Sequence, residues 1–154
     1  MAAGKLAVED AKLPLQEGGN DRIGTIVASG IGGRSTFESQ TRVLRERGPS
    51  RVSPLFIPMM IANMGAAQLS MALGLRGPLS CPVTACASGN HALGDALGVI
   101  RRGQADVMLA GGAGAAVTPV GISAFNAMKA LSTRNDDPQT ASRPFDIDRD
   151  GFVM

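Results

Sequence analysis

Tryptophan and tyrosine are absent from this 154-residue chain, and phenylalanine occurs only five times. Proteins that bind nucleic acid combine basic patches with aromatic side chains on which bases stack. The net charge here is only +2 and no run of Lys or Arg stands out, so the composition argues against a nucleic-acid partner. No uninterrupted apolar stretch reaches the roughly 18 residues of a membrane span, and we expect no membrane partner.

Cysteine and histidine are also scarce, because the chain holds only Cys81, Cys86 and His91. Two cysteines five residues apart make no disulfide framework, which favours a reducing compartment. One imidazole and two thiols without ligand-type spacing do not build a metal site. Charged side chains interrupt residues 1–15, so this segment is not a signal peptide. We therefore expect a cytoplasmic protein with no bound metal.

Enough apolar residues remain to form a real core, since 44% of the chain is hydrophobic and 18% is charged. Apolar runs and helical periodicity alternate along the chain. Strands are predicted over 23–28, 79–84 and 107–110, and helices over 3–13, 36–47, 59–73, 88–102 and 119–131. A connection over 48–58 and a long polar loop over 132–151 complete the chain. This alternation predicts an α/β fold with a mainly parallel sheet.

The helices carry further predictions about burial. The helix over 88–102 is expected to turn Leu93, Ala96, Leu97 and Ile100 toward the core, and Gly103 is expected to end it. The helix over 59–73 is apolar nearly all round, which predicts burial on several sides.

Two glycine clusters, at 30–33 and 111–114, each follow a predicted strand. Neither has the third glycine of a dinucleotide-binding turn or the Lys-Ser/Thr pair of a phosphate loop. We expect both to be turns in which backbone segments approach closely.

Cys86 lies where the predicted strand over 79–84 meets the helix over 88–102. Unpaired N–H groups and the positive end of a helix dipole stabilise a thiolate there, and the thiolate is the nucleophilic form. Ala85, Ala87 and Ser88 are small, so the sulfur stays approachable. Burial as a small core residue is the competing interpretation of Cys86. His91 follows five residues later, about 140° around a helix, which favours a structural role packed behind the turn over a catalytic one.

Further segments occur in a fixed order along the chain. They are SPLFIP at 53–58, NM at 63–64, TACASG at 84–89, GQADVMLAGG at 103–112, LSTRND at 131–136, SRPFD at 142–146 and RDGFVM at 149–154. Together they resemble the β-ketoacyl-acyl-carrier-protein synthases over essentially the whole chain, and the type II condensing enzymes of fatty-acid synthesis are the nearest kind.

The resemblance implies a thiolase-like fold, in which two similar halves pack as alternating layers of helix and sheet, and a homodimer without a cofactor. It implies that a cysteine takes an acyl group from acyl carrier protein, and that a malonyl group on the carrier then loses CO2 and attacks the acyl thioester. Cys86 matches the acylated nucleophile. Ile31 and Phe125 match positions that line the acyl pocket, and Lys129 matches a basic position that faces the carrier. Core packing for Ile31 and Phe125, and an ordinary surface lysine for Lys129, remain open interpretations.

Residues 1–154 match only a partial N-terminal thiolase-like half. The first strand of that half and the C-terminal half, which carries two histidines and a lysine for decarboxylation, are not matched. We therefore expect this chain to carry only the acylation half of the site. Three alternatives stay open: a polyketide-type ketosynthase, a non-catalytic interaction module, and a hydrolase with a cysteine elbow. The hydrolase motif requires glycine at two positions where this chain has Thr84 and Ser88.

Overall fold

A computed structural model describes all residues from Met1 to Met154. The chain forms two compact units, which we call the sheet unit (Met1–Gly114) and the C-terminal unit (Ala115–Met154). Each is described by itself. No helix in either unit is long and apolar enough to span a membrane.

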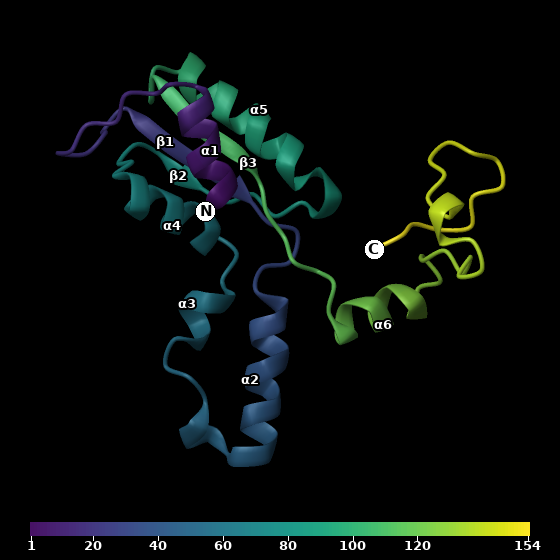
Figure 1. Ribbon diagram of the computed structural model, residues 1–154. Helices are drawn as coiled ribbons and strands as arrows, with labels where there is room; N and C mark the ends of the chain where they lie inside the picture. The colour runs from purple at the N-terminus through teal and green to yellow at the C-terminus, as the bar shows by residue number, and fades with distance from the viewer. The chain divides into compact units, whose positions relative to one another are not determined.

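Three parallel strands form the centre of the sheet unit (Figure 1). Their bounds are Ile23–Ala28 for β1, Leu79–Ser80 for β2 and Val107–Gly112 for β3, and their order is β2-β1-β3. The full length of β1 pairs with β3, whereas β2 pairs with it only through two residues. The predicted α/β class and parallel pairing are therefore confirmed, and β1 has the predicted bounds.

Helices cover both faces of this sheet. Helix α5 (Ser88–Arg101) packs on one face, where Ile26 and Ala28 of β1 join its buried residues in the largest apolar cluster. Helices α1 (Ala2–Asp10) and α4 (Met64–Leu73) lie toward the other face, where they line a cavity together with Val27 and Leu109. Successive residues of a strand point to opposite faces, so alternate positions of β1 serve the two sides.

The predicted inward face of α5 is wrong except for Ala96. The buried residues are Ser88, Ala92, Ala96 and Val99, whereas Leu93, Leu97 and Ile100 are between two-fifths and three-fifths exposed. Small side chains let the α5 backbone approach β1 and β3, so the helix turns its smaller residues inward. Gly103 ends the helix as predicted: its N–H donates to the Ile100 carbonyl, and the Gln104 N–H donates to the Val99 carbonyl.

Helices α2 (Arg34–Arg47) and α3 (Phe56–Met60) lie side by side and extend away from the sheet (Figure 1). The rings of Phe37 and Phe56 join them, with centroids 6.1 Å apart. A 3-10 turn at Pro49–Arg51 lies in the connection between the two helices.

The single helix predicted over 59–73 is wrong, because the chain breaks it into α3 and α4 at extended Ile61. The break follows from hydrogen bonds to other segments. Gly33 N–H donates to the Met60 carbonyl at 2.9 Å, and the Cys81 thiol donates to the Ala62 carbonyl at 3.3 Å. A Cβ on Gly33 would lie 2.4 Å from the Met59 carbonyl oxygen, so the close approach predicted for the first glycine cluster is confirmed.

Two further boundaries differ from prediction. Strand β2 ends at Ser80 rather than continuing to Thr84; Pro82 has no N–H to donate, and Cys81 bonds to Ala62 instead. Strand β3 continues two residues further than predicted, to Gly112.

The C-terminal unit holds helix α6 (Pro119–Ala127). Thr118 is the N-cap of this helix, and its hydroxyl oxygen accepts the Gly121 N–H at 3.0 Å. The helix ends before the predicted Leu131 because Lys129 adopts φ 55°, a left-handed conformation. Lys129 N–H then donates to the Asn126 carbonyl and Ala130 N–H donates to the Phe125 carbonyl.

The predicted loop over 132–151 contains one 3-10 turn, Pro138–Thr140, and returns to the end of α6. Leu131 and Phe152 form an isolated parallel bridge, and the Ser132 N–H donates to the Phe152 carbonyl at 3.0 Å. A Cβ on Gly151 would lie 2.4 Å from the Leu131 carbonyl carbon, so this return needs glycine.

Candidate active site

Cys86 lies in a 3-10 turn, Ala85–Ala87, directly before the first residue of α5. Its side chain is exposed, so the competing interpretation of Cys86 as a buried core residue is wrong. The turn places the thiol beside the N-terminal end of a 14-residue helix, whose first N–H groups have no side-chain cap. Such a position is electropositive, and it favours a negatively charged sulfur.

The backbone of this turn is strained at the residue before the cysteine. Ala85 has φ 51°, a left-handed conformation that is uncommon for any residue with a Cβ. The strain is of the order of 1–2 kcal/mol, so the surroundings have to hold the residue there. Observed strain of this kind is concentrated at functional sites, and here it adjoins an exposed cysteine thiol.

The Ser88 hydroxyl holds the turn together by two hydrogen bonds, which we call the Ser88 clamp. Its hydroxyl oxygen accepts the Thr84 N–H at 2.9 Å, and the hydroxyl donates to the Ala85 carbonyl oxygen at 2.6 Å. The Ser88 side chain is only 4% exposed, so few competing water contacts reach it. Backbone bonds from Ala87 to Thr84 and from Ser88 to Ala85 complete the turn, and they leave the Cys86 N–H outside the bonding pattern.

The ends of β1 and β3 lie against this turn. A Cβ on Gly30 would meet Ala85 at 3.7 Å, and a Cβ on Gly112 would meet the Cα of Gly89 at 3.4 Å. Ile31, which follows Gly30, is half exposed on the loop after β1. The sheet unit therefore brings Ile31 and Cys86 to the same end of the sheet, where the carboxyl ends of the parallel strands meet.

His91 lies on α5 with an exposed side chain, so the prediction that it packs behind the turn is wrong. No hydrogen bond joins its imidazole to Cys86. The chain supplies the candidate nucleophile and its turn without an imidazole base in contact with the thiol.

The other two predicted site residues belong to the C-terminal unit. Phe125 is half-buried and packs edge-on against Phe152, with ring centroids 5.2 Å apart at 80°. Lys129 is exposed at the end of α6 and makes no ion pair. Packing within the unit thus accounts for the place of Phe125, and the role predicted for each residue stays a prediction.

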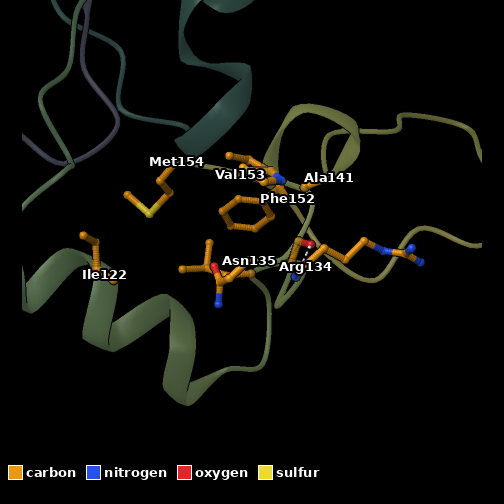
Figure 2. A pocket seen from close by; sticks show the side chains of 10 residues that line it. Ile122, Arg134, Asn135, Ala141, Phe152, Val153 and Met154 are labelled. Atoms are coloured by element: carbon orange, nitrogen blue, oxygen red, sulfur yellow. Dashed lines mark hydrogen bonds between the residues drawn. The ribbon is translucent and has the colours of Figure 1, made fainter.

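A pocket of about 190 Å³ opens in the C-terminal unit (Figure 2). Apolar side chains from α6 and from the last residues of the chain dominate its wall, among them Ile122, Leu131, Phe152 and Met154. Phe125 is not part of the lining, although its ring packs against Phe152, which is.

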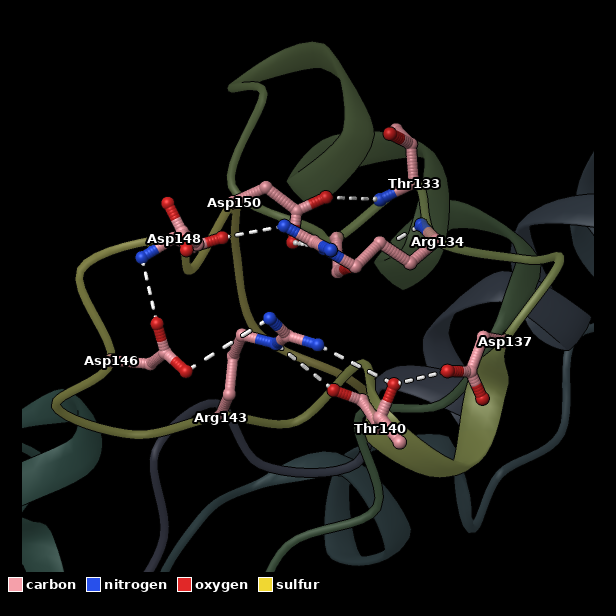
Figure 3. Close-up of polar contacts among 9 residues, drawn as sticks. Thr133, Arg134, Asp137, Thr140, Arg143, Asp146, Asp148 and Asp150 are labelled. Carbon is pink, nitrogen blue, oxygen red and sulfur yellow. Dashed lines mark hydrogen bonds and ion pairs between the residues drawn. The ribbon is translucent and has the colours of Figure 1, made fainter.

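Two arginines anchor the loop that returns from the end of α6 (Figure 3). Arg134 donates to the carboxylate of Asp150 at 3.3 Å and to the Asp148 carbonyl at 2.6 Å. Arg143 donates to the Thr140 carbonyl at 3.1 Å and faces Asp146 at 3.9 Å.

The carboxyl group of Asp150 has a pKa below its ordinary value. The Ser132 hydroxyl is the largest cause, and the Thr133 N–H and Arg134 add to it, while partial burial opposes them. Each of these donors favours the charged carboxylate. This set of bonds ties the LSTRND and RDGFVM segments together.

Sequence patterns alone did not single out the clamp made by Ser88 or the bonds around Asp150. The signal for Ser88 was present as a hydroxyl residue at the start of a predicted helix, two residues after the candidate nucleophile. For Asp150 the partners Ser132, Thr133 and Arg134 lie 16 to 18 residues earlier in the chain, and no local pattern pairs them with it.

A family model for the beta-ketoacyl synthase N-terminal domain matches residues 1–154. Among curated proteins, the chain is 50% identical to 3-oxoacyl-[acyl-carrier-protein] synthase 2 of Synechocystis sp. and 52% identical to the protein of the same name from Vibrio cholerae. Both alignments include 100% of this chain and 37% of the relative. The chain thus spans little more than a third of the length of these curated relatives.

Solved structures give the same likeness. A ketosynthase in complex with a type II polyketide acyl carrier protein matches with a TM-score of 0.87 and 32% identity, over 98% of this chain and 38% of that one. A beta-ketoacyl synthase from Burkholderia phymatum matches with a TM-score of 0.87 and 32% identity, over 99% of this chain and 37% of that one. The thiolase-like fold prediction is therefore confirmed.

Proposed function

Since this chain belongs to the β-ketoacyl synthase family, whose N-terminal domain it matches throughout, we propose that it supplies the acylation half of a 3-oxoacyl-acyl-carrier-protein synthase. Cys86 is the nucleophile in this proposal. The observation that carries it is the exposed thiol on a strained turn at the start of α5.

The proposed step is a transthioesterification. The Cys86 thiolate attacks the carbonyl carbon of an acyl thioester on acyl carrier protein, and a tetrahedral oxyanion forms. The bond from that carbon to the carrier's sulfur then breaks, and the carrier leaves as a thiolate that takes up a proton. The Cys86 N–H, which the turn leaves without a partner, is placed on the nucleophile itself and is a natural donor to the oxyanion.

The whole enzyme would complete a decarboxylating condensation. A malonyl group on the carrier loses CO2, and the resulting carbanion attacks the acyl group on Cys86 to give the 3-oxoacyl product. No histidine of this chain bonds to the thiol, so we assign decarboxylation to groups outside residues 1–154. A homodimer and a cytoplasmic location stay predictions.

We further propose fatty-acid synthesis rather than polyketide synthesis as the pathway. The identity of 50–52% to 3-oxoacyl-acyl-carrier-protein synthases of two bacteria exceeds the 32% to a polyketide ketosynthase, and this difference favours the fatty-acid class. Ile31, at the same end of the sheet as Cys86, is proposed to contact the acyl chain, and so is Phe125. Lys129 is proposed to meet the acidic carrier, where opposite charges accelerate encounter.

Intact-mass measurement tests the acylation step. The purified chain is incubated with acyl carrier protein that bears a medium-length acyl thioester, with Cys86→Ala as the control. We expect the mass to rise by one acyl group, and the Cys86→Ala variant to show no increment. A chain that is folded by circular dichroism and gains no acyl group would contradict the proposal and favour a non-catalytic interaction module.

A further inference from the structure

We propose that Ser88 is the positioning residue for Cys86: its hydroxyl clamps the turn and thereby aims the thiol and the Cys86 N–H at one carbonyl group. This inference rests on the proposed function, because it assumes that Cys86 attacks an acyl thioester. In this inference Ser88 acts on the reaction only through the position that it gives to Cys86.

The Ser88 hydroxyl acts as both donor and acceptor on the turn. A serine hydroxyl has one proton and two lone pairs, and Ser88 uses both capacities within five residues of chain. It accepts from the Thr84 N–H at 2.9 Å and donates to the Ala85 carbonyl at 2.6 Å. One bond holds the carbonyl of the Ala85–Cys86 peptide itself, and the other holds the N–H of Thr84 on the far side of Ala85, so together they fix the direction in which the Cα–Cβ bond of Cys86 leaves the backbone.

The clamp also holds Ala85 in its strained backbone conformation. Ala85 is held at φ 51°, and a residue with a Cβ leaves that region when nothing retains it. The Ala85 carbonyl accepts two donors, the Ser88 N–H and the Ser88 hydroxyl. Loss of the hydroxyl would remove one of these bonds and the bond from Thr84 together, which leaves the strained peptide held at its carbonyl by the Ser88 N–H alone.

Burial of Ser88 protects the clamp from solvent. Ser88 is 4% exposed and the neighbouring Cys86 is exposed, so the clamp works from inside the fold on a group that faces solvent. In a buried place a serine hydroxyl finds few competing partners, and its bonds hold their geometry. A reaction between two positioned groups is sensitive to such geometry, because a displacement of about 1 Å can slow it a hundredfold.

Ser88→Ala is the direct test, and Ser70→Ala is a matched control. The Ser70 hydroxyl also donates to a backbone carbonyl, that of Leu75 at 2.5 Å, but it lies on α4, away from the turn. We expect Ser88→Ala to slow acyl transfer to Cys86 by about tenfold or more, with an unchanged carrier concentration at half-maximal rate. We expect Ser70→Ala to stay within about twofold of the wild-type rate.

Two further readouts separate positioning from a general structural role. Alkylation by iodoacetamide needs only an exposed thiol, so its rate in Ser88→Ala should stay within about threefold of wild type while acyl transfer falls. Amide hydrogen exchange at Thr84 should accelerate in Ser88→Ala and not in Ser70→Ala. Ser88→Thr retains the hydroxyl, and we expect it to recover most of the acyl-transfer rate.

A double variant keeps the test decisive if Ser88→Ala folds poorly. Glycine tolerates left-handed φ, so Ala85→Gly in the Ser88→Ala background should restore folding. Acyl transfer should stay slow, since nothing would then aim the thiol. Recovery of acyl transfer in this double variant would overturn the inference.

The rates of the single variants and of the wild-type chain distinguish failure of the positioning role from failure of the proposed function. Acyl transfer in Ser88→Ala within about twofold of wild type, or an equal loss in Ser70→Ala, overturns the positioning role. If the folded wild-type chain itself takes no acyl group, the proposed function fails; exchange at Thr84 then decides alone whether Ser88 holds the turn, and unchanged exchange overturns it.

Discussion

At the scale of single residues, several positions are explained by the space or the bond that only one side chain allows. Gly33 approaches the Met59 carbonyl so closely that a Cβ has no room, although its own φ of −78° suits any residue. Gly94, in the middle of α5, has open space on the side where a Cβ would project. Packing therefore requires glycine at position 33, whereas neither packing nor conformation requires it at position 94.

We expect Gly33→Ala to lower the free energy of unfolding by about 1–3 kcal/mol, because the added methyl group forces α3 and the β1–α2 loop apart. Gly94→Ala should raise it by up to about 1 kcal/mol, because alanine has the higher helix propensity. Urea unfolding followed by circular dichroism measures both. Equal effects of the two substitutions would contradict this account of Gly33.

Arg22 and Asp106 link the starts of β1 and β3 by two hydrogen bonds, one of them 2.6 Å long. The hydrogen bond from Arg22 lowers the pKa of Asp106, and Asp106 in turn raises the pKa of Arg22. A carboxyl group with a lowered pKa in the folded state adds stability above its ordinary pKa, and that stability is lost as the pH falls through the lowered value.

We therefore expect the urea concentration at the midpoint of unfolding to decrease as the pH is lowered from about 4 to about 2. Part of that decrease should be absent in Arg22→Gln. Both side chains are more than half exposed, so the effect should be small and should weaken in 0.5 M salt. Arg76→Gln is the control, because Arg76 meets Asp21 only at 3.8 Å. An identical pH profile in wild type and Arg22→Gln would exclude this pair as a cause.

At the scale of secondary-structure elements, helix ends decide where the candidate site residues lie. Helix α6 stops at Ala127 because Lys129 takes the left-handed conformation that glycine usually supplies. A lysine at such a position is strained, and its charged side chain remains exposed. The residue thus combines a conformational strain with a charge that we propose for carrier recognition.

Lys129→Gly should separate these two properties. We expect the free energy of unfolding to rise by about 1 kcal/mol, since glycine relieves the strain, while the carrier concentration at half-maximal acylation rises because a charge is lost. Lys129→Gln loses the charge and keeps the strain, so it should weaken carrier recognition without the gain in stability. Unchanged carrier dependence in both variants would remove Lys129 from the docking surface.

At the scale of the whole molecule, the exposed face of α5 stands out in the sheet unit. Leu93, Leu97 and Ile100 recur at helical spacing and are 56%, 49% and 40% exposed. In the layered fold that the family implies, such a face is expected to be covered by a further layer. The chain of residues 1–154 leaves it open to solvent.

We expect the purified chain to self-associate through this face. Light scattering after size-exclusion chromatography should give a mass that rises with concentration, and Leu97→Glu should shift it toward the monomer without loss of helix signal. Met71→Glu, on α4 at a residue that is 64% exposed, is the control and should leave the association in place. A chain that is monomeric at all concentrations would contradict the expectation.

Local signals in the sequence were enough to predict the class of fold and the place of the proposed nucleophile. The β-branched run over 23–28, the apolar run in β3 and the glycine after α5 are local signals, because each depends on the propensity of neighbouring residues. The same holds for Cys86 between a strand-like and a helix-like segment. The ordered motifs along the chain gave the family, which the comparisons confirm.

Tertiary structure alone decided which faces are buried and where several elements end. Helix periodicity placed the larger apolar residues of α5 inward, but close packing on β1 and β3 selected the small ones. The break between α3 and α4 depends on donors from distant segments. Gly33 lies 27 residues before Met60, whose carbonyl accepts its N–H, and Cys81 lies 19 residues after Ala62, whose carbonyl accepts its thiol.

Bonds across such separations form only when folding brings the segments together, so no local pattern predicts them. The clamp made by Ser88 lies between these two cases. Its partners are close in sequence, but the hydroxyl reaches both of them only because Ala85 is held in a left-handed conformation. Local sequence signals were enough to place a cysteine just before this helix. The packed turn decided how its thiol is presented, because side-chain direction follows from backbone strain that the surrounding fold maintains.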